Sequence, residues 1–213
     1  MSLFHQHNIN EYTRLGIWHI EEPENFFLQK VPLQKGISHP HKRLQHLAGR
    51  YLLKQLFPDF PQDEILIADT RKPYLPFEQY HFSISHCGDY AAAIVSSRQR
   101  VGIDIEIPTE KLLKISHKFL HPKERILLFE AEADHITAKH LDRLTIAWSA
   151  KESVFKWWSY GKVDFKEQIS LGNFGDTPTG NFRASFTKEN TQYPLALFYQ
   201  LFPELCLVWM VND

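Results

Sequence analysis

The chain has 213 residues, of which 43% are hydrophobic and 14% aromatic, enough for one sizeable core or two small lobes. This composition excludes disordered and fibrous classes. The formal net charge of −1 excludes a globally basic nucleic-acid-binding protein. Cys87 and Cys206 fit no metal or redox spacing, which indicates a reducing compartment without a disulfide framework.

Targeting and membrane signals are also missing from the sequence. The first ten residues lack the basic-then-apolar layout of a signal peptide, and the longest apolar run, which starts at Leu205, is too short to cross a bilayer. We therefore expect a soluble cytoplasmic protein that binds neither membranes nor nucleic acid.

In the first half, short apolar segments follow one helical pattern. A strand is predicted from Leu15 to Ile20, and apolar residues at helical spacing predict a helix over 41–57. Strands are predicted over 65–70, 81–87 and 90–97. Gly88 and Asp89 supply a hairpin turn between the last two of these strands.

The second half roughly repeats this order. It begins with a strand over 101–107, passes through charged helical segments to Trp158, and ends in strand-like pieces near Asn181, Tyr193 and Leu205. Strands that cluster in runs predict an α+β fold. The echo between the halves predicts two similar lobes, each a small, mostly antiparallel sheet packed with a long helix and related by a pseudo-twofold axis.

Two carboxylates lie in the segment VGIDIEI, Val101–Ile107. Apolar residues alternate there with Gly102, Asp104 and Glu106, so a strand would place both carboxylates opposite the apolar face. They would lie about 6.6 Å apart along the strand, close enough to lean toward one Mg²⁺ or Mn²⁺. An amphipathic edge strand gives the same pattern, so the metal interpretation needs a third carboxylate elsewhere.

The segment from Leu141 to Trp158, LDRLTIAWSAKESVFKWW, predicts an uninterrupted helix. Glu152 and Lys156 are four residues apart and are therefore neighbours on its surface. One interpretation is an ordinary surface ion pair. In the other, Glu152 completes the metal shell or takes a proton from an incoming hydroxyl, and Lys156 neutralises a departing phosphate. The predicted buried face consists of Leu141, Leu144, Trp148, Phe155 and Trp158.

Candidate anion-binding residues lie in the first half. Lys72 precedes the strand over 81–87, and Ser85 with His86 stands at the end of that strand. Strand ends and turns expose groups that bind anions, although a Ser-His pair also arises as two polar groups that satisfy each other.

The predicted first helix begins with the basic sequence HPHKRLQHLAGR. A solvated basic face is the simplest interpretation of Lys42, Arg43 and Arg50. If a phosphorylated donor lies nearby, they become anion clamps, and Arg43 is the first choice among them.

Four motifs in this order closely resemble those of the 4'-phosphopantetheinyl transferases of the surfactin-synthetase-activating type. They are KPY at Lys72, SISHCG at Ser83, VGIDIE at Val101, and WSAKES at Trp148 with Lys156 following. The resemblance spans roughly residues 43–161. This sequence departs from the pattern at Arg71, where glycine is often found, and at Cys87, where serine is common.

The resemblance implies transfer of the 4'-phosphopantetheine arm of coenzyme A to a serine of an apo acyl or peptidyl carrier protein. It implies Mg²⁺, with Mn²⁺ as the alternative ion. By motif position the metal ligands are Asp104, Glu106 and Glu152, and the catalytic residues are Glu152 and Lys156. The expected coenzyme A contacts are Arg43, Lys72, Ser85 and His86.

The resemblance also implies a monomer of two lobes. Donor contacts are expected in an N-terminal lobe over 1–100, and metal carboxylates with carrier-facing helices in a C-terminal lobe over 101–213. The basic and apolar segment 111–129 suits an acidic carrier helix, although a helix packed on its own core gives the same pattern. Two alternatives are a metal-dependent phosphohydrolase and a non-catalytic carrier-protein-binding module.

Overall fold

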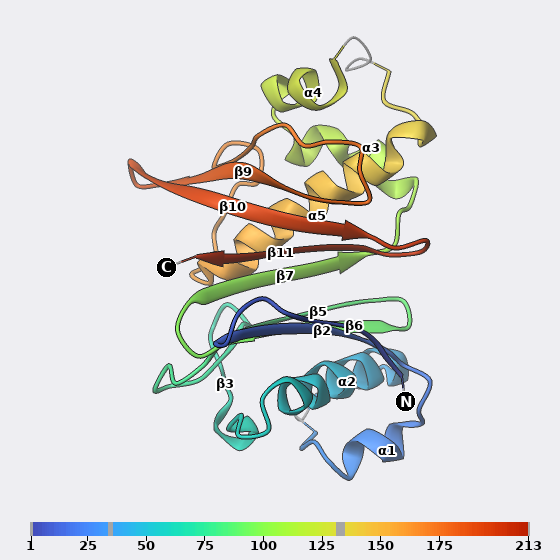
Figure 1. Ribbon diagram of the computed structural model, residues 1–213, viewed down its shortest axis with the longest axis vertical. Helices are drawn as coiled ribbons and strands as arrows, with labels where there is room; N and C mark the ends of the chain where they lie inside the picture. The colour runs from blue at the N-terminus through green and yellow to red at the C-terminus, as the bar shows by residue number, and fades with distance from the viewer. Residues whose placement is uncertain (1, 34–35, 131–134, 213) are drawn as a thin grey trace. The chain divides into compact units, whose positions relative to one another are not determined.

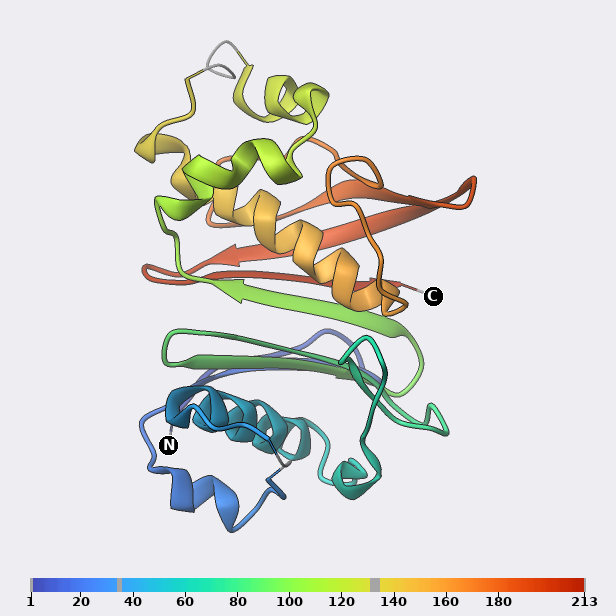
Figure 2. The same ribbon diagram turned by 180° about the vertical axis from the view of Figure 1, so that it is seen from behind.

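The computed structural model describes residues 2–33, 36–130 and 135–212 (Figure 1). The chain divides into two compact units, Met1–Ile103 and Asp104–Asn212. Each unit combines antiparallel strands with helices, as the view from behind also shows (Figure 2), so the predicted α+β class is confirmed. Among the helices described, none has both the length and the apolar character that crossing a bilayer requires.

The first unit contains a four-stranded antiparallel sheet in the order β1-β2-β6-β5. Its central strand β6 is buried along its whole length, and three consecutive alanines there leave room for a helix to approach. The predicted hairpin turn is confirmed: Cys87 pairs with Tyr90, and Gly88 adopts a positive φ of 53°. The strands are β1 (Leu3–Asn8), β2 (Thr13–His19), β5 (His81–Cys87) and β6 (Tyr90–Ser96).

Helix α2 (Pro40–Leu56) packs against this sheet. It begins with a proline in its first turn, after the His39 side chain that caps it, and it ends before Pro58. A β-carbon at Gly49 would come within 2.7 Å of Ile84 Cγ2, so glycine allows α2 to lie closely against β5. The remaining elements are α1 (Glu24–Leu28), η1 (Gln62–Glu64), β3 (Leu66–Ile67) and β4 (Pro73–Tyr74).

A second sheet has five strands in the order β7-β11-β10-β9-β8. Helix α5 (Leu141–Trp158) packs on β11 and spans the predicted residues, ending where Ser159 adopts a left-handed φ of 73°. The strands are β7 (Arg100–Glu106), β8 (Ile169–Leu171), β9 (Thr179–Lys188), β10 (Thr191–Leu201) and β11 (Cys206–Asn212). The other helices are α3 (Lys111–Phe119), α4 (Pro122–Phe129) and η3 (Ala138–His140).

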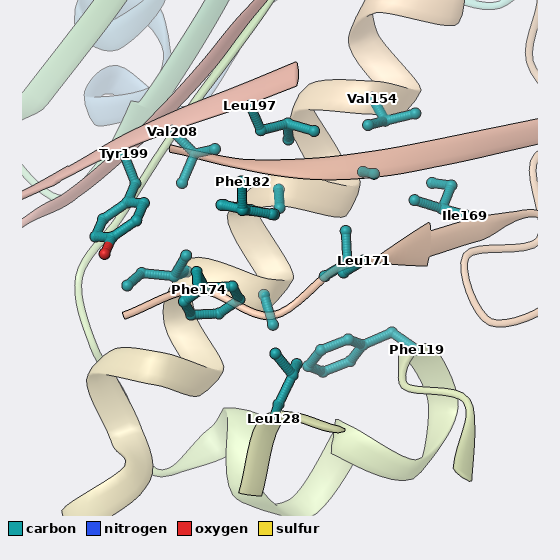
Figure 3. Close-up of a cluster of buried hydrophobic side chains, with 14 of the residues drawn as sticks. Phe119, Leu128, Val154, Ile169, Leu171, Phe174, Phe182, Leu197, Tyr199 and Val208 are labelled. Carbon is teal, nitrogen blue, oxygen red and sulfur yellow. The ribbon is translucent and has the colours of Figure 1, made fainter. Parts of the chain in front are cut away.

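The core of the second unit gathers side chains from α3, α4, α5 and the sheet (Figure 3). Phe119 from α3 and Leu128 from α4 lie close to Leu171 of β8, while Val154 of α5 and Leu197 of β10 lie at the other end of the view. The helical segment between β7 and α5 is therefore anchored to the same core as α5.

Strand β7 is buried along most of its length, with Asp104 only 3% exposed, which disagrees with the alternative of an edge strand whose polar face meets water. The predicted burial pattern of helix α5 is wrong. Helix α5 is buried around most of its circumference, and of its five predicted core residues only Leu144 is fully buried. The strand β1 was not predicted, and the strand predicted over 65–70 is reduced to Leu66–Ile67.

Candidate active site

Strand β7 and helix α5 bring the predicted acidic residues together in the second unit. Lys156 Nζ donates a hydrogen bond to Asp104 Oδ1 at 2.6 Å. Two turns earlier on α5, Trp148 Nε1 donates to Glu106 Oε1 at 3.3 Å. Positions 148, 152 and 156 are four residues apart and form one stripe, so Glu152 lies on the face of α5 that meets the two carboxylates of β7.

The electrostatics of Glu152 reflect this crowding. Its pKa is raised from 4.5 to about 7, first by burial and then by the negative charge of Asp104, with Glu106 adding to the effect and Lys156 opposing it. The Lys156 ammonium therefore lies among three carboxylates, those of Asp104, Glu106 and Glu152.

The donor chemistry of this cluster suits Mg²⁺ or Mn²⁺, which bind carboxylate oxygens. Within the described residues, however, no group of three or more His, Cys, Asp and Glu side chains has the arrangement of a formed metal site. The ammonium of Lys156 stands beside Asp104 and supplies part of the compensating charge. The mutual repulsion of Asp104 and Glu152 is the feature that a bound cation would relieve.

The predicted donor contacts lie in the first unit. Ser85 and His86 are consecutive in β5, so their side chains point to opposite faces of the sheet; Ser85 is buried and His86 exposed. Lys72 is half-buried, and its carbonyl closes a turn by accepting from the Ala68 N–H at 2.9 Å. In that turn Arg71 has a φ of 65°, a conformation that glycine adopts more easily and that explains why glycine suits this position.

Arg43, the first choice among the basic residues of the first helix, is already engaged. Its Nη2 donates to Glu24 Oε2 at 2.9 Å and its Nε to Glu24 Oε1 at 2.5 Å, which ties α2 to α1. Its Nη1 donates to the carbonyls of Ile37 and Ser38 at 3.3 Å. The N–H groups of the Arg43 guanidinium therefore already donate to partners within the first unit.

A buried ion pair that sequence reasoning missed supports the position of α5. Lys151 is 0% exposed, and its Nζ donates to Glu124 Oε2 at 2.7 Å and to the carbonyls of Phe165 and Ile169. Glu124 also accepts from the Leu171 N–H. Lys151, which directly precedes Glu152 in the motif WSAKES, thus joins α5 to α4 and β8. Its position inside this motif was the one sequence feature that could have indicated its structural role.

Comparisons with known proteins point to one family. The model of the 4'-phosphopantetheinyl transferase superfamily matches residues 100–205, which include β7 and α5. "Enterobactin synthase component D" of Escherichia coli (strain K12) is 36% identical over 143 residues, which cover 63% of this chain and 66% of that protein.

Two further relatives are similar over shorter shares of their length. The "putative 4'-phosphopantetheinyl transferase" of Haemophilus influenzae is 30% identical over 151 residues, covering 66% of this chain and 60% of the relative. The "4'-phosphopantetheinyl transferase gsp" of Aneurinibacillus migulanus is 33% identical over 112 residues, covering 52% and 44%. The matched part of the chain spans less than two thirds of each of these three relatives. The chain belongs to the 4'-phosphopantetheinyl transferase superfamily.

Proposed function

We propose that this chain transfers the 4'-phosphopantetheine group of coenzyme A to a serine of an apo acyl or peptidyl carrier protein, in an Mg²⁺-dependent reaction. Membership of the superfamily supports the proposal. The observation that carries it is the cluster on β7 and α5, in which burial and then the charges of Asp104 and Glu106 raise the pKa of Glu152. Fatty-acid, polyketide and peptide synthesis all use carriers of this class.

In this proposal Asp104, Glu106 and Glu152 hold the metal ion, and Mn²⁺ is the alternative ion. When bound, the ion supplies positive charge to the pyrophosphate of the donor. The acidic excess of the cluster and its all-oxygen ligands support this assignment.

Glu152 is the proposed base. It takes the proton of the carrier serine hydroxyl as the serine oxygen forms a bond to the phosphorus of the phosphopantetheine group. The bond from that phosphorus to the bridging oxygen breaks, and its electron pair leaves with adenosine 3',5'-bisphosphate. Lys156, whose ammonium lies beside Asp104, neutralises charge on this leaving phosphate.

The donor contacts are proposed in the N-terminal part of the chain, residues 1–100. Lys72, Ser85 and His86 retain the roles that the motif resemblance gives them. Arg43 is the least suited of the predicted contacts, because its guanidinium already donates to Glu24 and to two carbonyls.

The carrier is proposed to dock on the C-terminal part, residues 101–213, at the helices between β7 and α5. Helix α4 exposes Ile126 and Leu127, which are 63% and 43% exposed, beside the exposed Lys123. Helix α3 adds the exposed Lys118. Basic residues around exposed apolar side chains suit an acidic carrier helix, with charge speeding the encounter and apolar contact holding the complex.

The proposal is tested by Glu152→Gln, which keeps the size of the side chain and removes its basicity. We expect kcat to fall by about 10²-fold or more, the contribution of a positioned base, while coenzyme A still binds. Glu204→Gln, a change at an exposed glutamate near the start of β11, is the matched control. A Glu152→Gln rate close to that of the unmodified protein would remove Glu152 from the mechanism.

A further inference from the structure

Arg143, in the first turn of α5, binds three parts of the second unit through one guanidinium group. Its Nε donates to the carbonyl of Leu128, in the last turn of α4, at 2.6 Å. Its Nη1 donates to Asp176 Oδ1 and its Nη2 to Asn173 Oδ1, each at 2.5 Å. The guanidinium also lies over the ring of Phe174, 4.8 Å from the centroid. Arg143 therefore ties α5 both to the end of α4 and to the segment between β8 and β9.

The segment between β8 and β9 is a firm base for this contact. Phe174 is only 4% exposed, and its ring centroid lies 4.7 Å from that of Phe182 in β9. The hydroxyl of Tyr199 in β10 donates to the carbonyl of Gly175 at 3.0 Å. The residues on either side of this anchored pair are the two whose side chains accept from Arg143. The guanidinium is thus held by the sheet as well as by its own helix.

The contact with Leu128 caps α4. The last four carbonyls of an α-helix have no partner within the helix, and a cation near them also opposes the negative end of the helix dipole. Helix α4 has only eight residues, whereas isolated helices shorter than about 12–15 residues are marginal in water. Its order must therefore come from tertiary contacts, and Arg143 supplies one of them.

The other end of α4 is held by a second cation of α5. Glu124, in the first turn of α4, accepts from the His121 N–H at 2.8 Å and from Lys151 Nζ at 2.7 Å. Lys151 follows Arg143 by eight residues, which is about 12 Å along the helix axis and matches the length of an eight-residue helix. The two cations therefore hold α4 at its two ends.

This attachment leaves one face of α4 exposed. Leu128 and Phe129 are buried in the core of the second unit. Ile126 and Leu127 are 63% and 43% exposed, and Lys123 is exposed beside them. The contacts that hold α4 thus lie apart from the side chains that it presents to solvent.

We propose that Arg143 is a positioning residue for the carrier protein. Glu152 follows it by nine residues in the same uninterrupted helix, so Arg143 fixes the exposed face of α4 relative to the proposed base. An acidic carrier helix then meets Ile126 and Leu127 on a surface that is already ordered, which lowers the entropic cost of binding. The inference rests on the proposed function for the identity of this partner.

Arg143→Leu tests this role, because it removes the guanidinium and keeps an apolar side chain. The carrier would then have to order α4 as it binds, and such an ordering cost should raise the KM for the carrier by about 10-fold. The KM for coenzyme A should stay unchanged, since the donor contacts are proposed in residues 1–100. Arg183→Leu, at an exposed arginine of β9 in the same unit, is the matched control and should change neither constant.

A double-variant cycle with Ile126→Ser distinguishes positioning from a general structural role. If Arg143 acts through the exposed face of α4, the combined variant should raise the carrier KM by less than the product of the two single effects. All rates are measured well below the Tm of each variant. Independent, multiplicative effects would overturn the inference, as would a fall in kcat with an unchanged carrier KM.

Arg143→Lys keeps the proposal testable if Arg143→Leu does not fold. Lysine retains the positive charge but lacks the planar fork that reaches three acceptors at once. It takes the place of leucine in the same cycle, and an unchanged carrier KM in Arg143→Lys would then reject the positioning role.

Direct binding separates this inference from the proposed function. An apo acyl carrier protein is titrated by calorimetry into the unmodified chain, Arg143→Leu and Arg183→Leu, without coenzyme A. Binding that weakens about 10-fold in Arg143→Leu alone, in a chain that transfers no phosphopantetheine, would uphold the positioning role and reject the function. Transfer by a chain whose carrier affinity does not depend on Arg143 would do the reverse. Absence of carrier binding by the unmodified chain would also reject the positioning role.

Discussion

Glu152 is a carboxyl group whose ionised form is disfavoured by burial and by neighbouring negative charges. Its pKa in the folded chain, about 7, lies above the ordinary value of 4.5, so the folded state binds more protons than the unfolded state between these pH values. The contribution of Glu152 to folding stability is therefore fully present below about pH 4.5, and it is lost as the pH rises through 7.

This pH dependence determines how Glu152→Gln should change the thermal stability of the chain. In EDTA, Glu152→Gln should have a higher Tm than the unmodified chain at pH 8, and the difference should shrink toward pH 5, because glutamine carries no charge at either pH. Thermal unfolding followed by circular dichroism at a series of pH values measures it. A difference that is constant with pH would show that burial and the neighbouring carboxylates do not raise the pKa of Glu152.

Lys151 is the second residue whose role depends on burial. Its ammonium is enclosed by Glu124 and two carbonyls, and burial lowers its pKa while the charge of Glu124 raises it. Lys151→Met should reduce the free energy of unfolding by about 3–5 kcal/mol, because it leaves the Glu124 carboxylate buried without its counter-charge. Urea denaturation gives the value, and Lys114→Met on the exposed face of α3 should change it by less than about 0.5 kcal/mol.

The double change Lys151→Met with Glu124→Gln distinguishes charge from packing. If the cost comes from the uncompensated carboxylate, the double variant should be more stable than the sum of the two single changes predicts. Simple additivity would assign the loss to packing instead.

At the scale of elements, α3 and α4 form the surface proposed for the carrier. Charge reversal by Lys118→Glu together with Lys123→Glu should raise the KM for the carrier, with little change in the KM for coenzyme A, because both lysines are exposed on the surface proposed for the carrier. Arg125 is less suitable for this test, since its Nη1 donates to Ser116 Oγ at 3.2 Å and its replacement would also disturb α3. Steady-state kinetics with each substrate varied in turn measure both constants.

The effect on the carrier should weaken as salt increases, because exposed charges are screened over about 8 Å at physiological ionic strength. A carrier KM that is unchanged by the double charge reversal at low salt would place docking elsewhere on the chain.

For the molecule as a whole, local patterns predicted several elements correctly. Helix α5 matches its predicted residues because no proline or glycine interrupts it, and the hairpin of β5 and β6 follows from Gly88 and Asp89. Strand β1 was missed because five of its six side chains are exposed, so that its pairing with β2 leaves no alternation in the sequence. The burial of β7 on both faces depends on neighbours that are distant in sequence.

The candidate site was predictable in its residues but not in its contacts. Helical spacing pairs Lys156 with Glu152, yet the ammonium donates to Asp104, which lies 52 residues away in sequence. Likewise, Arg43 and Arg50 read as one basic face, and tertiary packing alone decides that Glu24 neutralises the first and that the second is buried. Contacts between segments far apart in the chain are not contained in a local pattern.

Transfer of phosphopantetheine would be seen in the mass of the acceptor. The purified chain is incubated with coenzyme A, Mg²⁺ and an apo carrier protein, and the intact carrier is weighed by mass spectrometry. The carrier should gain one phosphopantetheine group, and this gain should require Mg²⁺ and be lost with Glu152→Gln. An unchanged carrier mass would contradict it: cleaved coenzyme A would then indicate a phosphohydrolase, and intact coenzyme A with a bound carrier would indicate a non-catalytic binding module.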